Sequence, residues 1–431
     1  MHSKIKLAII AALFLVSLYF FWPGILRVDS IGQYEQAVMG TFNDHHPPIM
    51  AAFWRILNYI YQGPAPMLIF HLSLLWGAAA VFCMSYKKSA WSWFFVIIPL
   101  WPQVLCYAPF VLKDAGFALS FLLAAALLSH YTLQQKKPPL GLVVFILLLM
   151  FYGAAVKYQG IFLLPVLCLW LAGTFQAFKK IKTVFWGGLL FCFMFFNVET
   201  LNNSITNSKN YSWQYVKLYD LASISLQTNK NLFPNFILQY PNYSLSHVAQ
   251  AFDSKRVDSL VWSDKPALII GSNDLERQAL LDTWWQVIQL YPKEYIQHRA
   301  QLITHLFQNS PIKSMSMVSS HQAYIPLTLR ILLEYCETHG IIKFIQSITT
   351  FDIYLPWMLS YLFFGMFYFT KSPYAVVLTF LNGMGVLLLC VLSIFSMASD
   401  GRYIYLSMCC FHFSHPFFAK CLSFKSLKEV S

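Results

Sequence analysis

Long uninterrupted runs of apolar residues limit most strongly how this chain can fold. A run of roughly 20 apolar residues is long enough to cross a bilayer as a helix. The chain is 58% hydrophobic and only 11% charged, whereas a soluble protein carries about a quarter charged residues. The sequence therefore predicts an all-α polytopic membrane protein with about 10 transmembrane helices. The predicted helices cover residues 7–26, 66–84, 91–110, 115–131, 140–156, 161–177, 184–198, 353–370, 374–397 and 403–419.

Positive charge is concentrated in alternate loops between these segments. Of the 18 acidic residues, only Glu429 lies among the basic loops and ends. Cytoplasmic loops are enriched in Lys and Arg, so this pattern predicts that both termini are cytoplasmic in a bacterial inner membrane. The net charge of +12 then reports topology, and no nucleic-acid partner is expected. The lysines of this side are Lys4, Lys6, Lys87, Lys88, Lys136, Lys137, Lys179, Lys180, Lys182, Lys371, Lys420, Lys425 and Lys428.

The predicted topology divides the chain into three parts. Residues 1–198 form an N-terminal transmembrane module, residues 199–350 an external segment, and residues 351–431 the C-terminal transmembrane helices. The first external loop, 27–65, contains an apolar and aromatic stretch at 49–61 that predicts a helix lying in the membrane interface. The long external segment holds most of the acids and is expected to be mainly helical. The pattern fits either a compact domain or a set of interfacial helices.

Groups that can exchange protons are concentrated in the first external loop. Asp29 follows the first apolar segment directly, and Glu35 and Asp44 share its loop. A carboxylate at a partly desolvated boundary is expected to have a raised pKa, which makes it a better proton acceptor near neutral pH. Asp29 is therefore the first candidate for a general base, and Asp44 is the second. The alternative for Asp29 is a solvated carboxylate near a helix end.

His45 and His46 are followed by Pro47 and Pro48. Adjacent histidines point in different directions, so a shared metal ion would need ligands from elsewhere. The prolines fix the backbone and disfavour helix before them. The histidine pair is thus either a rigid entry to the next helix or a turn that aims one histidine at a substrate.

Three basic residues are expected at the same external membrane level. Lys113 precedes Asp114 at the start of an apolar helix, where burial at mid-bilayer would cost about 2.5–3.5 kcal/mol for each charge. The two residues form either a structural salt bridge or a phosphate-binding lysine oriented by an aspartate. The topology places Lys157 and Arg402 at this level too. Three cations along one membrane face would attract an anionic headgroup.

Together, these residues resemble the GT-C superfamily of membrane glycosyltransferases. Protein O-mannosyltransferases and lipid A aminoarabinose transferases belong to it. The resemblance is carried by Asp29 after the first helix, by the stretch 44–48, by the interfacial helix and by the Lys113-Asp114 turn. The run 29–36 resembles a bacterial branch of that superfamily. Ser30 stands where many members carry an acid, so a metal site built on paired acids is not expected.

The resemblance implies an inverting transfer of a sugar from a polyprenyl-phosphate donor to an acceptor hydroxyl of the cell envelope. Asp29 would accept the proton of that hydroxyl. The lipid phosphate would depart toward Lys113, Lys157 or Arg402. Substrate-binding roles are expected for these cations and for His45, His46, Glu35 and Asp114, and Asp44 is the second catalytic candidate. Participation of a divalent cation stays open.

Two other functions compete with this interpretation. An envelope polysaccharide polymerase or ligase would rely on Arg and His in the long external segment, where His298 and Arg299 stand. A transporter or flippase of lipid-linked substrates would need ionisable residues near mid-membrane, whereas the acids here lie at helix edges. The transferase hypothesis adds a geometric expectation: Asp29, Lys113 and Arg402 should converge on one external cavity.

Overall fold

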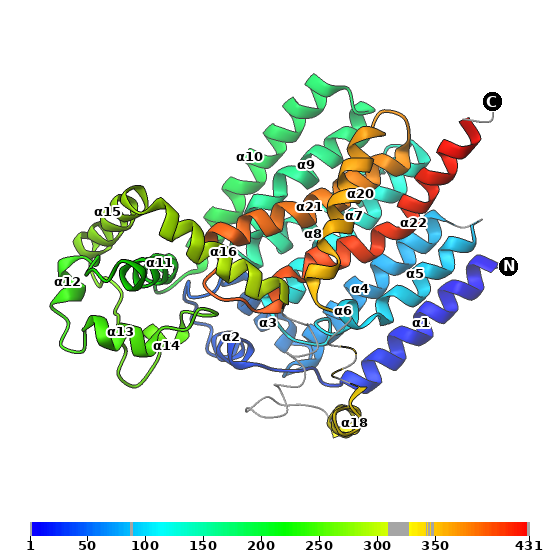
Figure 1. Ribbon diagram of the computed structural model, residues 1–431. Coiled ribbons are helices and arrows are strands. Elements are labelled where there is room, and N and C mark those ends of the chain that lie inside the picture. The colour runs from blue at the N-terminus through cyan, green and yellow to red at the C-terminus, as the bar shows by residue number, and fades with distance from the viewer. Residues whose placement is uncertain are drawn as a thin grey trace. The chain divides into compact units, whose positions relative to one another are not determined.

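A computed structural model describes residues 2–86, 89–308, 327–341, 343, 345 and 349–428 (Figure 1). Within these ranges every regular element is helical, and the few β-bridges are isolated, which confirms the all-α prediction for this part of the chain. Five of its helices are long and apolar enough to cross a membrane. They are α1 (His2–Phe21), α4 (Ala65–Ser85), α7 (Lys113–Gln134), α10 (Lys180–Ile205) and α21 (Pro373–Phe395). The sequence predicted about 10 transmembrane helices, and the spans beyond these five candidates stay a prediction.

Four further helices match predicted segments: α8 (Leu140–Val156), α9 (Gly160–Gln176), α20 (Leu355–Phe367) and α22 (Tyr405–Lys428). Before α20, the chain forms the 12-residue helix α18 (Leu327–Thr338) and the short helix η4 (Phe351–Ile353). Three residues of the charge pattern, Lys87, Lys88 and Glu429, lie outside the described residues, as does 309–326 of the external segment.

The segment 91–110 is not the continuous helix that its apolar composition predicts. It is divided into η1 (Ala90–Trp93), α5 (Phe94–Ile97), η2 (Ile98–Leu100) and α6 (Pro102–Leu105). Pro99 and Pro102 cause the division, because proline lacks an amide hydrogen and clashes with the preceding helical turn. Trp101, just before Pro102, is extended with ψ 133°, as expected before proline.

The first helix ends at Phe21 rather than at residue 26. Pro23 and Gly24 follow, and Gly24 has a φ of +115°, which favours glycine. Beyond this break, the Ile25 amide donates to the Pro109 carbonyl, and the Val111 amide donates to the Ile25 carbonyl, both at 3.0 Å. These bonds hold the residues that lead into Asp29 beside the residues that lead into Lys113.

The residues after this break form a helix that the apolar pattern does not predict, α2 (Val28–Met39). Its buried positions include Ser30 and Gln33, so polar side chains occupy most of the helix face that is turned inward. The helix α3 (Ile49–Asn58) follows and confirms most of the predicted helix 49–61. Arg55 of α3 donates to the carbonyls of Ala37 and Val38 at 3.1 and 3.0 Å, which satisfies the C-terminal end of α2.

The described residues divide into two compact units. The larger unit falls within residues 1–208, 310–389 and 402–431. In it, α4 packs against α1 and α7, α7 against α8 and α22, and α9 against α8 and α10 (Figure 1). Helix α7 is buried along most of its length, and the side chains of its first turn are thereby fixed among neighbouring helices.

The smaller unit covers residues 209–309 and 390–401. Its helices are α11 (Trp213–Thr228), α12 (Asn235–Leu238), α13 (Leu245–Ala251), α14 (Asp258–Val261), α15 (Asp274–Leu290) and α16 (Pro292–Gln308). The described part of the external segment is therefore mainly helical, as predicted. This unit has its own apolar core, which includes Leu218, Leu221, Leu280 and Leu302. It begins later than residue 199, because α10 continues to Ile205.

Candidate functional site

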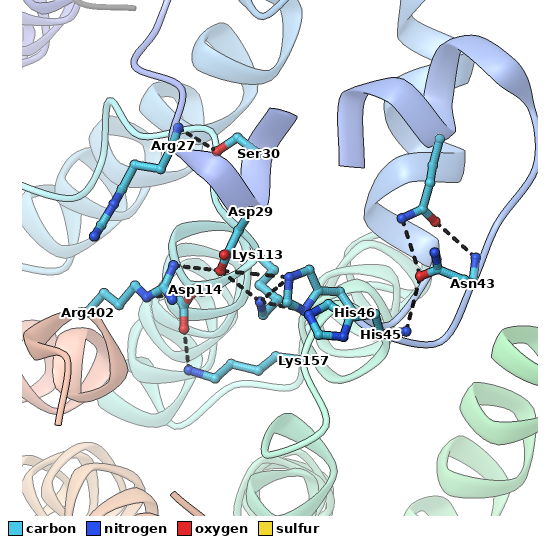
Figure 2. A network of polar contacts seen from close by, with 11 residues as sticks. Arg27, Asp29, Ser30, Asn43, His45, His46, Lys113, Asp114, Lys157 and Arg402 are labelled. Carbon is cyan, nitrogen blue, oxygen red and sulfur yellow. Dashed lines mark hydrogen bonds and ion pairs between the residues drawn. The ribbon is translucent and has the colours of Figure 1, made fainter. Parts of the chain in front are cut away.

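Three side chains from distant parts of the sequence meet at the carboxylate of Asp29, in the first turn of α2 (Figure 2). Arg402 Nη1 donates to Asp29 Oδ2 at 2.7 Å, and Lys113 Nζ lies 3.4 Å from the same oxygen. His46 Nε2 lies 3.8 Å from it. Arg402 belongs to the short helix η5 (Gly401–Ile404), and Lys113 opens α7. Asp29, Lys113 and Arg402 therefore meet, as expected, while their position at one external cavity stays a prediction.

A second carboxylate, Asp114, lies beside the first. Lys157 Nζ donates to Asp114 Oδ1, and Arg402 Nε lies 3.8 Å from Asp114 Oδ2. Figure 2 shows the Arg402 side chain extending between the two aspartates. Lys113 and Asp114, although adjacent in sequence, therefore make their closest ion pairs with different partners. The simple Lys113–Asp114 salt bridge is not the main contact of either residue.

This group of Asp29, Asp114, Lys113, Lys157 and Arg402 is called the ion cluster below. Three cations face two carboxylates, which leaves one net positive charge. The Asp114 and Lys157 side chains are only 1% and 3% exposed, whereas Asp29 is 25% exposed. Burying unbalanced charge is unfavourable, so a cluster of this composition favours an anionic ligand. Asp29 is its most accessible member.

Helix ends help to place both carboxylates. Asp29 and Asp114 each stand in the first turn of a helix, where the helix dipole favours negative charge. Lys113 at the start of α7 has the opposite, unfavourable sign for that position. Its contacts with Asp29 and His46 offset this disadvantage.

The loop that carries the two histidines is fixed on both sides. The Asp44 amide donates to the Ser208 carbonyl at 3.2 Å, and Tyr158 Oη donates to the Asp44 carbonyl at 2.7 Å. Lys113 Nζ donates to His46 Nδ1 at 2.9 Å. The loop is thus a fixed turn, and it places His46 beside Lys113. That His46 is directed at a substrate stays a prediction. His45 stacks beside it, with ring centroids 4.6 Å apart.

The expectation that Asp29 has a raised pKa is wrong. Burial alone would raise the pKa of this carboxyl, but the charges of Arg402 and Lys113 outweigh burial and hold it well below its usual value. The sequence placed Lys113 and Arg402 at the level of Asp29, but it did not show that these residues, 84 and 373 positions away, contact its carboxylate. Asp29 is therefore ionised at neutral pH.

The two histidines are neutral at neutral pH. Burial, with the positive charge of Lys113, holds the pKa of His46 well below its usual value. Burial and Lys113 also lower the pKa of His45, although the charges of Asp29 and Asp44 oppose them. Neutral histidines leave the net charge of the ion cluster unchanged.

Glu35 is the predicted site residue that the structure does not bring to the cluster. It is exposed on α2, six residues after Asp29. At about 100° for each residue, the two side chains point to different faces of the helix. Asp44 contributes through its backbone and through its charge on His45.

Tyr403 and Tyr158 are site residues that the sequence did not indicate. Lys157 Nζ lies 4.9 Å from the centroid of the Tyr403 ring, and Arg402 Cζ lies 5.4 Å from it. The ring thus contacts two members of the ion cluster through cation–π interactions. Its position next to Arg402 was the only available signal.

His298 and Arg299, the residues of the ligase hypothesis, lie in the core of the smaller unit. Arg299 Nη2 donates to Asp220 Oδ2 at 2.6 Å, and Arg299 Nη1 donates to the Ser396 carbonyl at 2.5 Å. Trp284 Nε1 also donates to Asp220 Oδ2, at 2.9 Å. These bonds join α11, α15 and α16, and His298 and Arg299 are buried at their junction. The ligase hypothesis is not tested by these contacts.

The ion cluster can hold an anion beside an ionised carboxylate. Among the described residues, no group of three or more His, Cys, Asp or Glu side chains is arranged to hold a metal ion. Comparisons with protein-family models, with curated proteins and with solved structures found no match to this chain.

Proposed function

We propose that this chain is a membrane glycosyltransferase of the GT-C type. It would transfer a sugar from a polyprenyl-phosphate donor to a hydroxyl of an envelope acceptor, with inversion at the anomeric carbon. One observation carries the proposal: an accessible, ionised Asp29 shares a single carboxylate oxygen with Arg402 and Lys113, within a cluster of net positive charge.

The cations suit a departing lipid phosphate. When the bond between the anomeric carbon and the phosphate oxygen breaks, the phosphate leaves with the electron pair and its negative charge grows. Lys113 and Arg402 are already directed to one point by packing, so little rearrangement is needed when that charge develops. An arginine also binds phosphate oxygens through two parallel N–H groups.

Asp29 suits the attacking side of the reaction. The acceptor oxygen forms its bond to the anomeric carbon on the face opposite to the phosphate, and its proton passes to the Asp29 carboxylate. A carboxylate with a lowered pKa is a weak base, so proton transfer would follow much of the carbon–oxygen bond breaking. A bound phosphate would compensate Arg402 and Lys113, and its negative charge would raise the pKa of Asp29 during turnover.

The membrane setting is part of the proposal. Five candidate spans and the alternation of basic loops support an integral protein of a bacterial inner membrane with both termini in the cytoplasm. On that topology, Asp29, Lys113 and Arg402 would face the outside, where polyprenyl-linked sugars and envelope acceptors meet. A divalent cation remains an option to be tested by adding and chelating it.

The test is sugar transfer by the purified chain in lipid nanodiscs supplied with labelled polyprenyl-phosphate sugars and envelope lipid acceptors. Asp29→Asn should lower turnover by about 10²–10⁴-fold, the usual contribution of a general base. Glu35→Gln is the matched control, because it removes an exposed carboxylate from the same helix and should change turnover less than about twofold. Near-normal transfer by a folded Asp29→Asn variant would contradict the assignment.

A further inference from the structure

Two polar side chains of the larger unit converge on α7 beside the ion cluster and have no role in the reaction above. His71 lies on α4 and Tyr152 on α8, and both approach Gly116 of α7. His71 Nε2 and Tyr152 Oη lie 3.3 and 3.1 Å from the position that a Cβ on Gly116 would take. Glycine at this position lets both polar atoms reach the same point of the helix.

Neither atom uses its hydrogen-bonding capacity. Both are buried, and neither has a hydrogen-bond partner among the described residues. His71 Nδ1 lies 3.0 Å from the Phe110 carbonyl oxygen, which can only accept, so Nδ1 carries the proton and donates. Nε2 of the neutral ring is then an acceptor, while the Tyr152 hydroxyl can donate. Leaving a buried donor and acceptor unpaired is unfavourable, which points to a ligand group between them.

The pair lies next to the proposed phosphate position. His71 contacts the carbonyl of Phe110, three residues before Lys113, and Gly116 follows Lys113 by three residues. Residues three apart share one helix face, and they lie about 4.5 Å apart along the axis. Gly116, where the pair converges, therefore lies one helical turn of α7 after the lysine that is proposed to bind phosphate.

An aromatic wall borders the pair. The rings of Phe53 and Phe70 lie with their centroids 5.4 and 5.1 Å from that of Tyr152, and 5.0 Å from each other. All three residues are partly exposed. Apolar and aromatic walls with a few converging polar groups are typical of sites for small organic groups, and here the polar groups can bind a hydroxyl.

On the basis of the proposed function, we infer that His71 and Tyr152 bind one hydroxyl of the donor's sugar. That hydroxyl would donate to His71 Nε2 and accept from Tyr152 Oη, which uses both of its hydrogen-bonding capacities. The sugar is bonded directly to the phosphate, so a phosphate at Lys113 brings the sugar to the neighbouring turn of α7.

Two substitutions separate this role from a structural one. Tyr152→Phe removes only the unpaired hydroxyl, and Gly116→Ala displaces Tyr152 and His71 by placing a methyl group against them. Alanine favours a helix more than glycine does, and deleting an unpaired buried hydroxyl removes an unfavourable group. If the pair binds nothing, both variants should leave the affinity for the sugar lipid unchanged, and Tyr152→Phe should also keep or raise the midpoint of thermal unfolding.

The measurement is the affinity of the full chain in nanodiscs for undecaprenyl phosphate and for undecaprenyl phosphate carrying glucose, mannose or galactose. We expect at least one sugar to strengthen binding over the bare lipid phosphate. Tyr152→Phe and Gly116→Ala should each weaken that sugar lipid by about five- to tenfold, as for loss of one or two hydrogen bonds. Both variants should bind the bare lipid phosphate like the wild type.

Matched controls come from the same helix bundle. Tyr86→Phe removes another buried hydroxyl without a partner among the described residues, about 22 Å along α4 from His71. Gly77→Ala adds a methyl group whose nearest neighbour atom is 3.7 Å away. Neither control should change the affinity for the sugar lipid. Deoxy analogues of the bound sugar identify the hydroxyl, because the analogue that lacks it should bind the wild type and Tyr152→Phe equally.

The inference fails if no sugar strengthens binding, if both variants bind the sugar lipid like the wild type, or if they weaken the bare lipid phosphate equally. The last result would indicate displacement of Lys113 rather than loss of a hydroxyl site. Failure of the proposed function looks different, because the wild type would then neither bind undecaprenyl phosphate nor transfer a sugar.

Discussion

Asp29 and Asp220 both bind an arginine, yet they differ in exposure and in the balance between burial and neighbouring charge. Asp220 is fully buried, and its Oδ2 accepts from Arg299 and Trp284. Burial raises the pKa of Asp220 despite the charge of Arg299. Asp29 is 25% exposed, and burial is outweighed by its cations, so that its pKa is lowered. This difference is why we propose an anion site beside Asp29 and a structural role for Asp220.

The largest expected effect would break the structural side of this comparison. Asp220→Asn leaves Arg299 buried without its counter-charge, which typically costs about 3–5 kcal/mol. We expect a large fall in the thermal unfolding midpoint, measured on the full chain. Asp258→Asn in the same unit is the control, because its pair with Arg256 is half exposed and 3.8 Å long, and such pairs contribute about 0–1 kcal/mol. Equal midpoints for the two variants would show that Asp220 is not a structural anchor.

The second effect tests the functional side. Arg402→Ala removes the side chain that contacts both Asp29 and Asp114. Loss of one preorganised stabilising group should lower turnover by about 10²–10³-fold. Arg256→Ala, at an exposed arginine, should leave turnover unchanged. Normal sugar transfer by a folded Arg402→Ala variant would remove the arginine from the mechanism.

The third effect is on pH-dependent stability and concerns His46. Its pKa in the folded protein lies below the unfolded value of about 6.5. The unfolded chain therefore takes up this proton first as the pH falls, and stability is lost below pH 6.5 by up to about 1.4 kcal/mol for each pH unit. Asp29 acts in a different window: its lowered pKa stabilises the fold above about pH 4, and that stability is lost on further acidification.

The measurement for His46 is the difference in unfolding midpoint between pH 7.5 and pH 5 for the wild type and His46→Asn. The variant should show the smaller difference. His298, whose pKa burial lowers to about 3, titrates in the same direction but is common to both proteins, so it cancels in the comparison. An unchanged pH dependence in His46→Asn would mean that His46 is not held neutral by its surroundings.

The smallest expected effect concerns the rigidity of the histidine loop. Tyr158→Phe removes the hydrogen bond to the Asp44 carbonyl and should cost about 1 kcal/mol of stability or less. A few-fold decrease in turnover is expected, because His46 would be held less firmly beside Lys113. A loss of turnover as large as that of Arg402→Ala would show instead that Tyr158 acts in the reaction itself.

The sequence predicted most of the helices because apolar runs alone specify them. Helices α4, α7, α8 and α9 begin and end within a few residues of the predicted segments. It missed α2, because a helix whose buried face is polar has no apolar period. The segment 91–110 was wrongly predicted to be one helix, because its apolar composition was given more weight than Pro99 and Pro102. The sequence itself shows where these two prolines interrupt the helix.

The candidate site was predictable in part. Alternation of charged loops placed Lys113 and Arg402 at the membrane level of Asp29, and this shared level was the basis for expecting them to converge. The lowered pKa of Asp29 was not predictable, because it depends on which cations touch the carboxylate. Contacts between residues as far apart as Asp29 and Arg402 arise only from helix packing.

Binding of undecaprenyl phosphate to the full chain in nanodiscs tests the central claim most directly. The wild type should bind it saturably, and Lys113→Gln should weaken binding by about 10–100-fold, as for loss of a hydrogen bond to a charged group. Lys217→Gln, at a lysine of the smaller unit that lies over Trp213 and Trp284, should bind like the wild type. No saturable binding by the wild type, or equal binding by Lys113→Gln, would contradict a lipid-phosphate site at the ion cluster.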